Sequence, residues 1–284
     1  MKRRQARAAL AFLAVPMLFF ALMFFYPLVN EFATSMFSGP RADVFTGLGN
    51  YTRALGDDTI QHAFLVTVLY GIGALVVSAS LGLLLALILN QRLPGRAVLR
   101  GVLLVPYLTS IAIVGLLWRN ILDPQIGILN RLLGEVGLPT QAWLTTHPLA
   151  TLVAIAVWQQ VGYLTVLFLA GLQGIPEMYY EAAEVDGASV WRRFRHVTVP
   201  LLAPTTLFVS VIGVISALQE FALPYLVTGG GPADATDLFV FRMYQEAFNF
   251  RDFGYASALS YLLLIVILVL SVVQLKVGQR DDPA

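Results

Sequence analysis

The chain has 284 residues, of which 58% are hydrophobic and 12% are charged, with a formal net charge of +1. A soluble protein of this length could not cover its surface with so few charges, and a nearly neutral chain lacks the basic footprint of a nucleic-acid-binding protein. Because it contains no cysteine, it has no disulfide framework, thiolate metal site or cysteine nucleophile. We therefore expect an all-α integral membrane protein with one domain over residues 1–284.

Four basic residues lie within the first seven positions, and an apolar run over residues 8–29 follows them. A cleaved signal peptide is the alternative interpretation, but its apolar region has about 7–15 residues and ends at a small-residue cleavage site. This run is longer and ends in Tyr26-Pro27. We therefore expect an uncleaved first membrane span, followed by a polar loop over residues 31–60.

Further apolar segments are long enough to cross a membrane as helices. With the first, the expected transmembrane helices number six and cover residues 8–29, 61–89, 101–121, 149–169, 204–227 and 255–273. We expect Pro106 to lie inside the third, which a membrane helix tolerates when neighbours satisfy the freed carbonyl. The segment over residues 122–146 is only partly apolar, so we expect a short helix at the outer surface there.

Small residues recur at every fourth position of the second expected span, at Ala74, Ser78, Gly82 and Ala86. Such a stripe lets another helix approach closely. We favour packing within the chain as its role, with contact to a partner chain as the alternative.

A charged segment over residues 171–203 separates the fourth and fifth expected spans. Glu177–Val185 fits a short helix, and Asp186-Gly187 indicates a break because glycine tolerates the backbone angles of a sharp turn. Ser189 can cap a second short helix that ends before Pro200. We expect a helix–turn–helix that acts as a docking element.

Six spans place this segment and both termini on one side of the membrane. That side carries twelve Lys and Arg residues, and the opposite side carries six. Since basic residues are enriched on the cytoplasmic side, we expect the charged segment and both termini to be cytoplasmic.

The charged segment contains Glu181-Ala182-Ala183, with Gly187 four residues later, Val197 ten residues after that, and then Val199-Pro200. This arrangement resembles the EAA loop of ABC-importer permeases, in which Ile and Leu stand where this chain has Val197 and Val199. Asp186-Gly187-Ala188 resembles the sugar and glycerol-phosphate branch, and Thr228–Pro232 resembles the first of its two permease types. The resemblance covers nearly the whole chain. It implies the type I ABC-importer permease fold in the cytoplasmic membrane of a prokaryote.

The sequence contains no P-loop, catalytic set or metal-ligand spacing, so we expect neither an enzyme nor a cofactor on this chain. The resemblance implies that Mg-ATP is bound by two cytoplasmic ATPase subunits. It also implies a second homologous permease subunit and an extracytoplasmic substrate-binding protein as partners, within membrane lipid.

The resemblance assigns ATPase coupling to a group of residues in the charged segment: Glu181, Ala182, Ala183, Asp186, Gly187, Ala188 and Pro200. Glu181 is expected to make a charge-assisted bond at the ATPase dock, and Gly187 permits the turn. The alternative is that Glu181 only stabilises the N-terminus of its helix. The arginines at 192, 193 and 195 are alternatively a basic cluster that follows the orientation rule.

Polar groups inside membrane spans are costly and mark functional sites. The expected substrate path comprises Gln159, Gln160, Tyr163, Ser216, Gln219 and Glu220. Amide, carboxylate and aromatic groups suit the hydroxyls and the apolar ring face of a sugar. The alternatives are a structural hydrogen bond from Glu220 to a neighbouring helix and bridging of spans by the two glutamines.

We therefore expect a permease subunit of a binding-protein-dependent importer for a di- or oligosaccharide. The alternative substrate is glycerol-3-phosphate or a glycerophosphodiester, but Glu220 favours a neutral sugar because like charges repel. An ion-coupled carrier is the rival outside the family, and it would show inverted repeats and charged relays at mid-membrane.

Overall fold

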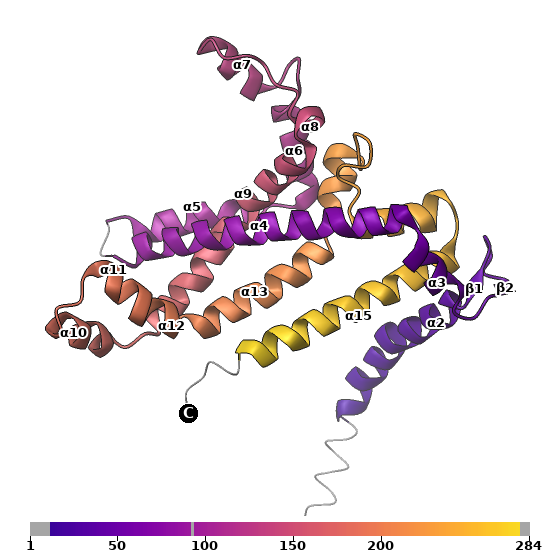
Figure 1. Cartoon of the computed structure of the whole chain (residues 1–284), viewed down its shortest axis with the longest axis horizontal. Coiled ribbons are helices and arrows are strands. Elements are labelled where there is room, and N and C mark those ends of the chain that lie inside the picture. The colour runs from indigo at the N-terminus through magenta and orange to yellow at the C-terminus, as the bar shows by residue number, and fades with distance from the viewer. Residues whose placement is uncertain (1–11, 92–93, 279–284) are drawn as a thin grey trace, which may run out of the picture. The chain divides into compact units, whose positions relative to one another are not determined.

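The computed structural model describes residues 12–91 and 94–278, which are mostly helical (Figure 1). The α-helices are α2 (Tyr26–Ser35), α3 (Gly49–Gly56), α4 (Asp58–Asn90), α5 (Arg96–Leu108), α6 (Ile111–Ile121), α7 (Ile128–Glu135), α8 (Trp143–Thr146), α9 (Pro148–Gln173), α10 (Glu177–Val185), α11 (Val190–Arg193), α12 (Val199–Leu201), α13 (Ala203–Leu218), α14 (Phe239–Tyr244) and α15 (Phe253–Gly278). The π-helical turns are η1 (Ala21–Phe25), η2 (Phe194–Thr198), η3 (Pro224–Thr228) and η4 (Gln245–Asn249), and the strands are β1 (Phe37–Ser38) and β2 (Val44–Phe45).

Four continuous helices among the described residues are long and apolar enough to cross a membrane, namely Phe12–Ser35, α4, α9 and α15. Two further stretches pass this test only as bent pairs, α5 with α6 and α11–α12 with α13. Six spans result if each bent pair is one span. Residues 8–11 of the first expected span, and the basic residues at 2, 3, 4, 7, 92 and 280, lie outside the described residues.

The sequence predicts one helix for the third expected span, 101–121. The structure instead has two helices there, which meet at an angle of 92°. Pro106 lies inside α5 and supplies no backbone N–H, and the Thr109 hydroxyl donates to the Val105 carbonyl at 2.7 Å. The helix ends at Leu108, and Thr109 takes an extended conformation before α6 begins at Ile111.

The fifth expected span, 204–227, is also interrupted. The helix α13 ends at Leu218, three residues follow outside any helix, and η3 begins at Pro224. A side-chain oxygen of Glu220 accepts the backbone N–H of Leu223 at 2.9 Å, so the carboxylate caps the next helical turn. A carboxylate that caps a helix stabilises the first turn of a new helix and not the continuation of the previous one. The apolar pattern of the sequence does not reveal this interruption.

The chain divides into two compact units. In the first, residues 12–61 and 243–265, a short antiparallel hairpin pairs Phe37 with Phe45, and Gly254 lies directly against the Phe37 carbonyl oxygen. The Arg53 guanidinium donates to Asp252 at 2.7 Å and lies 3.7 Å from the centre of the Tyr255 ring. These polar contacts join α3 to the start of α15.

The second unit, residues 62–242 and 266–278, holds two hydrophobic clusters, both of which involve α4 and α9. All four residues of the small-residue stripe on α4 are buried. A Cβ at Gly82 would stand 3.0 Å from the Leu164 Cβ of α9. The favoured prediction for the stripe, packing within the chain, is therefore confirmed.

Asp237 and Arg242 form a buried ion pair in the second unit, with Arg242 Nε 2.6 Å from an Asp237 oxygen and Asp237 only 1% exposed. Asp237→Asn is expected to destabilise the protein by about 3 kcal/mol, because it leaves a buried guanidinium without its main counter-charge. Asp234 supplies the matched control, since its 62% exposed side chain lies 3.7 Å from the same arginine. Asp234→Asn should cost less than about 1 kcal/mol. Thermal denaturation in detergent measures both, and equal shifts would contradict the assignment.

Candidate functional site

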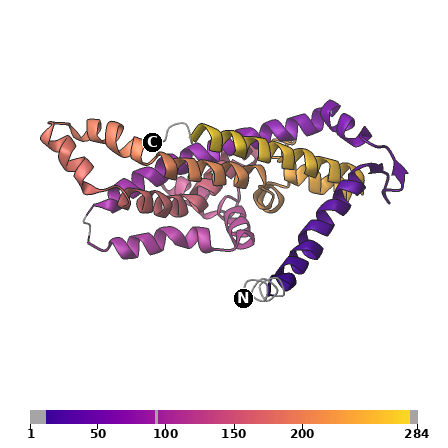
Figure 2. The ribbon, with the colours of Figure 1, turned by 90° about the horizontal axis from the view of Figure 1, so that it is seen from below.

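The predicted docking element is a hairpin of two short helices at one end of the second unit, beyond the ends of α9 and α13 (Figures 1 and 2). The helix α10 covers Glu177–Val185 as predicted, and Gly187 has a φ of +72°. The Ser189 hydroxyl accepts the Arg192 backbone N–H at 3.4 Å, which confirms the predicted cap of α11. The local sequence therefore determines the hairpin's turn.

Two contacts hold the hairpin together. The Tyr180 hydroxyl lies 3.2 Å from the hydroxyl of Thr198, which is buried, and Arg193 donates to Glu184 at 3.1 Å. The Glu181 side chain is exposed and makes no hydrogen bond or ion pair within the described part of the chain. Its carboxylate is consequently available to a group outside this chain.

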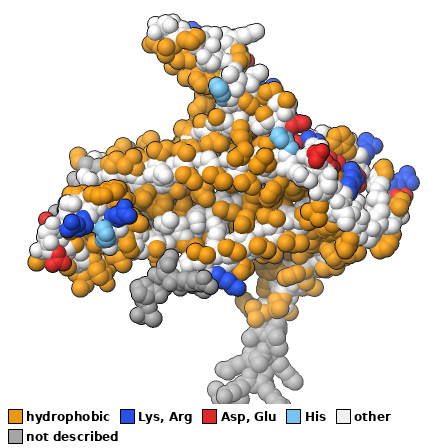
Figure 3. Space-filling model, viewed as in Figure 1, with side chains coloured by type: hydrophobic (Ala, Val, Ile, Leu, Met, Phe, Trp, Pro, Cys, Tyr) orange, Lys and Arg blue, Asp and Glu red, His pale blue; other side chains and the backbone are white. Residues whose placement is uncertain are grey.

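The hairpin exposes large apolar side chains together with charges. Met178, Val185, Val190 and Trp191 are all at least two-thirds exposed. On the visible face of the second unit, blue side chains gather over this hairpin, whereas hydrophobic side chains dominate the rest (Figure 3). Exposed apolar groups bordered by charge are typical of a protein–protein contact.

The same hairpin encloses a hollow of about 250 Å³. Its lining includes three of the predicted coupling residues, Ala183, Asp186 and Ala188, together with Arg192 and His196. The other predicted coupling residues, Ala182 and Pro200, are exposed. The structure thus brings most of the predicted coupling residues to one surface.

The predicted path residues on α9 lie near its middle. Tyr163 stacks on Tyr107 of α5 with ring centres 4.3 Å apart and planes 5° apart. Gln159 and Gln160 are partly buried one turn earlier, and Trp158 makes an edge-to-face contact with Trp118 of α6. The predicted glutamines therefore lie between two aromatic pairs.

The predicted path residues on the fifth span lie at its interruption. Ser216 and Gln219 are exposed, whereas Glu220 is partly buried and caps the turn that begins at Leu223. This hydrogen bond of the Glu220 side chain lies within its own segment. Its neighbours Ala217 and Leu223 pack in one cluster with Ile155 of α9.

Two residues near this site were not predicted. Tyr70 of α4 is 1% exposed and lies in the same cluster as Ala217 and Leu223, and its hydroxyl has no hydrogen-bond partner among the described residues. Tyr107 is the second. Tyr70 and Tyr107 are each a single tyrosine in an apolar segment of the sequence. Tyr107 also directly follows Pro106, and this position is the signal that could have identified it.

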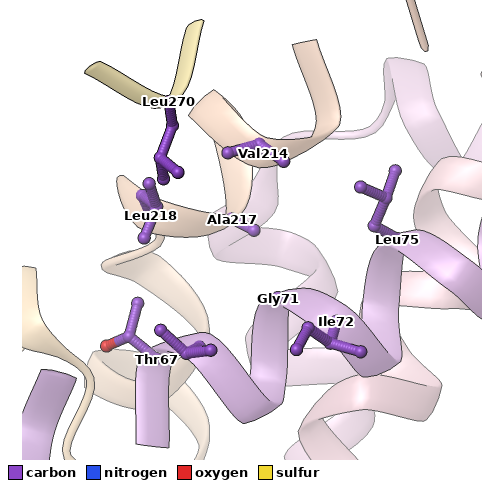
Figure 4. Close-up of a pocket in the computed structure, with 9 residues that line it drawn as sticks. Thr67, Gly71, Ile72, Leu75, Val214, Ala217, Leu218 and Leu270 are labelled. Carbon is purple, nitrogen blue, oxygen red and sulfur yellow. The ribbon is translucent and has the colours of Figure 1, made fainter. Parts of the chain in front are cut away.

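A small cavity beside the fifth span does not fit a sugar. It has a volume of about 160 Å³ and lies between Gly71 and Leu75 of α4, Val214 and Leu218 of α13, and Leu270 of α15 (Figure 4). The one hydroxyl on its wall, that of Thr67, already donates to the Ala63 carbonyl and accepts the Phe239 N–H. Without free polar groups the cavity cannot replace the water around sugar hydroxyls.

The fold and the site define a class, namely helical membrane proteins with polar residues inside interrupted spans and a helical hairpin suited to docking. No group of three or more metal-ligating side chains occurs among residues 12–91 and 94–278.

Residues 78–276 match the family described as "binding-protein-dependent transport system inner membrane component". The chain belongs to this family, and the predicted ABC-importer permease fold is confirmed.

Curated relatives agree with this assignment. The chain is 39% identical over 241 residues to the trehalose/maltose transport system permease protein MalF of Thermococcus litoralis, covering 83% of this chain and 80% of that protein. It is 34% identical to the sn-glycerol-3-phosphate transport system permease protein UgpA of Agrobacterium fabrum, covering 83% and 81%. It is also 34% identical to the arabinooligosaccharides transport system permease protein AraP of Bacillus subtilis, covering 94% and 87%.

A solved structure supports the fold along the whole length. The crystal structure of a bacterial ABC transporter involved in the import of the acidic polysaccharide alginate matches with a TM-score of 0.85 at 22% identity, covering 99% of this chain and 98% of that chain. At this identity the match demonstrates a shared fold.

Proposed function

We propose that this chain is a permease subunit of an ATP-driven importer that moves a di- or oligosaccharide across the cytoplasmic membrane. The observation that carries the proposal is the cluster of uncharged polar and aromatic groups at the middle of α9, beside the interruption at Glu220. Amides and stacked phenols recognise sugars by hydrogen bonds and by contact with the ring face. The relatives named for trehalose/maltose and arabinooligosaccharides support the same substrate class.

Glycerol-3-phosphate is the second candidate, because three relatives are named for its transport. A phosphate dianion is recognised by arginine, lysine or a helix N-terminus. Neither α9 nor the stretch over residues 203–228 contains a lysine or arginine, and the acidic Glu220 lies within that stretch. The charge of the site therefore favours a neutral sugar.

The proposed partner subunits are inferred from the exposed hairpin and from the lack of an ATP-binding motif in the sequence. With no P-loop in the sequence, ATP is bound by two separate cytoplasmic ATPase subunits. The exposed hairpin docks on one of them, and its Glu181 makes the charge-assisted contact. A second homologous permease completes the path, and an extracytoplasmic binding protein delivers the sugar. In this arrangement both termini are cytoplasmic, in agreement with the excess of basic residues on that side.

ATPase activity of the four-part complex in liposomes tests the proposal. Its own binding protein is supplied with maltose, trehalose, an arabinooligosaccharide, sn-glycerol-3-phosphate or a glycerophosphodiester. We expect stimulation by one neutral sugar. Stimulation only by a phosphate compound would overturn the substrate class but keep the importer. If no binding protein and ligand stimulate a complex that is otherwise active, the coupling mechanism is wrong.

A further inference from the structure

The segment between the third and fourth spans, residues 122–146, is held closed by one buried side chain; we call it the outer segment. Asn130 of α7 is 4% exposed. Its amide forms a reciprocal pair of bonds with Gln141, donating to the Gln141 carbonyl at 2.9 Å and accepting the Gln141 N–H at 3.0 Å. The amide nitrogen also lies 3.3 Å from the Pro124 carbonyl oxygen and 3.4 Å from that of Asp123. Asn130 therefore ties the two arms of the outer segment together.

The arm that leads into α7 is fixed by short-range contacts. A side-chain oxygen of Asp123 accepts the backbone N–H groups of Gln125 and Ile126 at 2.8 and 2.9 Å, which closes a turn. A Cβ at Gly127 would overlap the carbonyl oxygen of Asp123, so the chain passes here only with glycine. This turn sets the direction in which α7 begins.

The arm that leads out of α7 is fixed as well. Gly137 has a φ of +75°, and the Leu138 N–H donates to the Leu133 carbonyl at 2.8 Å, a pattern that ends a helix at a defined residue. Further on, Trp143 packs against a hydrophobic cluster of the second unit, and the Thr151 hydroxyl of α9 donates to its carbonyl at 3.1 Å. The outer segment is thus ordered from α6 to α9.

Such order has a physical cost and suits one kind of partner. Connecting segments at a surface are ordinarily mobile, and fixing their backbone costs conformational entropy. A fixed shape favours binding when the partner also has a fixed shape, because the entropy is then lost before the encounter. A lipid surface is fluid and requires only an amphipathic face. The closed outer segment therefore indicates a protein partner.

The position of the outer segment favours one protein among the proposed partners. One membrane span separates it from the hairpin, so it lies on the opposite, extracytoplasmic side. Within the second unit, α7 stands away from α4 and α9 (Figure 1). A soluble binding protein that delivers sugar on this side associates from solution, and each encounter benefits from a segment that is already ordered.

We propose that Asn130 is a positioning residue for transport, which holds the outer segment in the conformation that the sugar-loaded binding protein recognises. This inference rests on the proposed function, which supplies that partner, and it concerns a residue outside the expected coupling and path groups. The bonds of the Asn130 side chain all lie within residues 123–141. Their loss should loosen the outer segment and leave the spans packed.

Limited proteolysis of the assembled complex in nanodiscs measures the order directly. Arg131 is exposed beside Asn130, so trypsin cleavage after it reports local opening. Asn130→Ala should make this cleavage at least about tenfold faster, because cleavage follows the population of the open form. Asn130→Asp has the same size but cannot donate to the carbonyls, and it should act alike. Asn120→Ala is the matched control, since the exposed Asn120 donates to the Leu116 carbonyl of its own helix.

ATPase stimulation by increasing amounts of the sugar-loaded binding protein measures recognition. Asn130→Ala should raise the half-maximal concentration of that protein about tenfold, because the outer segment then loses its freedom only on binding. The maximal rate and the Tm of the complex should stay unchanged. A merely structural role would instead lower the maximal rate and the Tm together. Asn120→Ala should alter none of the three quantities.

The two measurements separate the possible failures. If cleavage after Arg131 is faster in Asn130→Ala but the half-maximal concentration is unchanged, the order of the outer segment does not serve recognition and the inference is wrong. A lower Tm and maximal rate at an unchanged half-maximal concentration would contradict it equally. In both cases the stimulated wild type leaves the proposed function standing. A wild-type complex that no loaded binding protein stimulates would remove the proposed function and this inference with it.

Discussion

Gly162→Ala is expected to reduce the stability of this permease by about 3 kcal/mol and to prevent assembly of an active complex. A Cβ at Gly162 would overlap the carbonyl oxygen of Leu103, so α5 and α9 could no longer approach at this level. A main-chain oxygen cannot move aside as a flexible side chain can. The stack of Tyr107 on Tyr163, one residue away on α9, would separate together with the helices.

The control for this substitution is Gly101→Ala in α5, where an added Cβ meets no atom within 4 Å. Replacing a helical glycine with alanine in open space should be neutral or stabilise by up to about 1 kcal/mol. Thermal denaturation and size-exclusion chromatography of the purified complex measure both variants. Similar behaviour of the two would mean that close packing of α5 on α9 is not essential.

Substitution of Gly187 is expected to uncouple ATP hydrolysis from transport while the protein remains in the membrane. Gly187 has a φ of +72°, and a side chain there would meet no other atom. The effect therefore comes from the backbone alone, where the left-handed conformation costs a β-carbon residue about 1–2 kcal/mol. Asparagine tolerates this conformation better than alanine, and valine tolerates it least. Sugar transported per ATP hydrolysed should fall in the order Gly, Asn, Ala, Val.

Glu181→Gln should give the same phenotype through a different cause, the loss of a charge at the proposed ATPase contact. Membrane abundance, measured by immunoblotting, separates coupling from folding. If Gly187→Val transports with normal coupling, the hairpin's turn is not part of the coupling path. Loss of the protein from the membrane in Glu181→Gln would instead assign Glu181 a folding role. Gly134→Ala, in open space on α7, is the control.

Local chemistry allowed much of this protein to be predicted from its sequence. The hairpin bounds, its turn at Gly187 and its cap at Ser189 depend on residues within a few positions of each other. Apolar length alone located four continuous spans, since a bilayer demands about 20 apolar residues whatever the neighbours are. The motif spacing of the charged segment predicted the family that residues 78–276 confirm.

Only the tertiary structure revealed where two spans are broken and what meets at the breaks. Hydropathy averages over a window and cannot register that Glu220 caps a new turn or that Thr109 bonds back to Val105. Tyr107 and Tyr163 are 56 residues apart in the sequence, and no local pattern links them. Their stacking depends on how closely α5 approaches α9 at Gly162, a contact between distant segments. Short-range chemistry thus determined the elements of this permease, whereas packing between distant helices decided which side chains share its site.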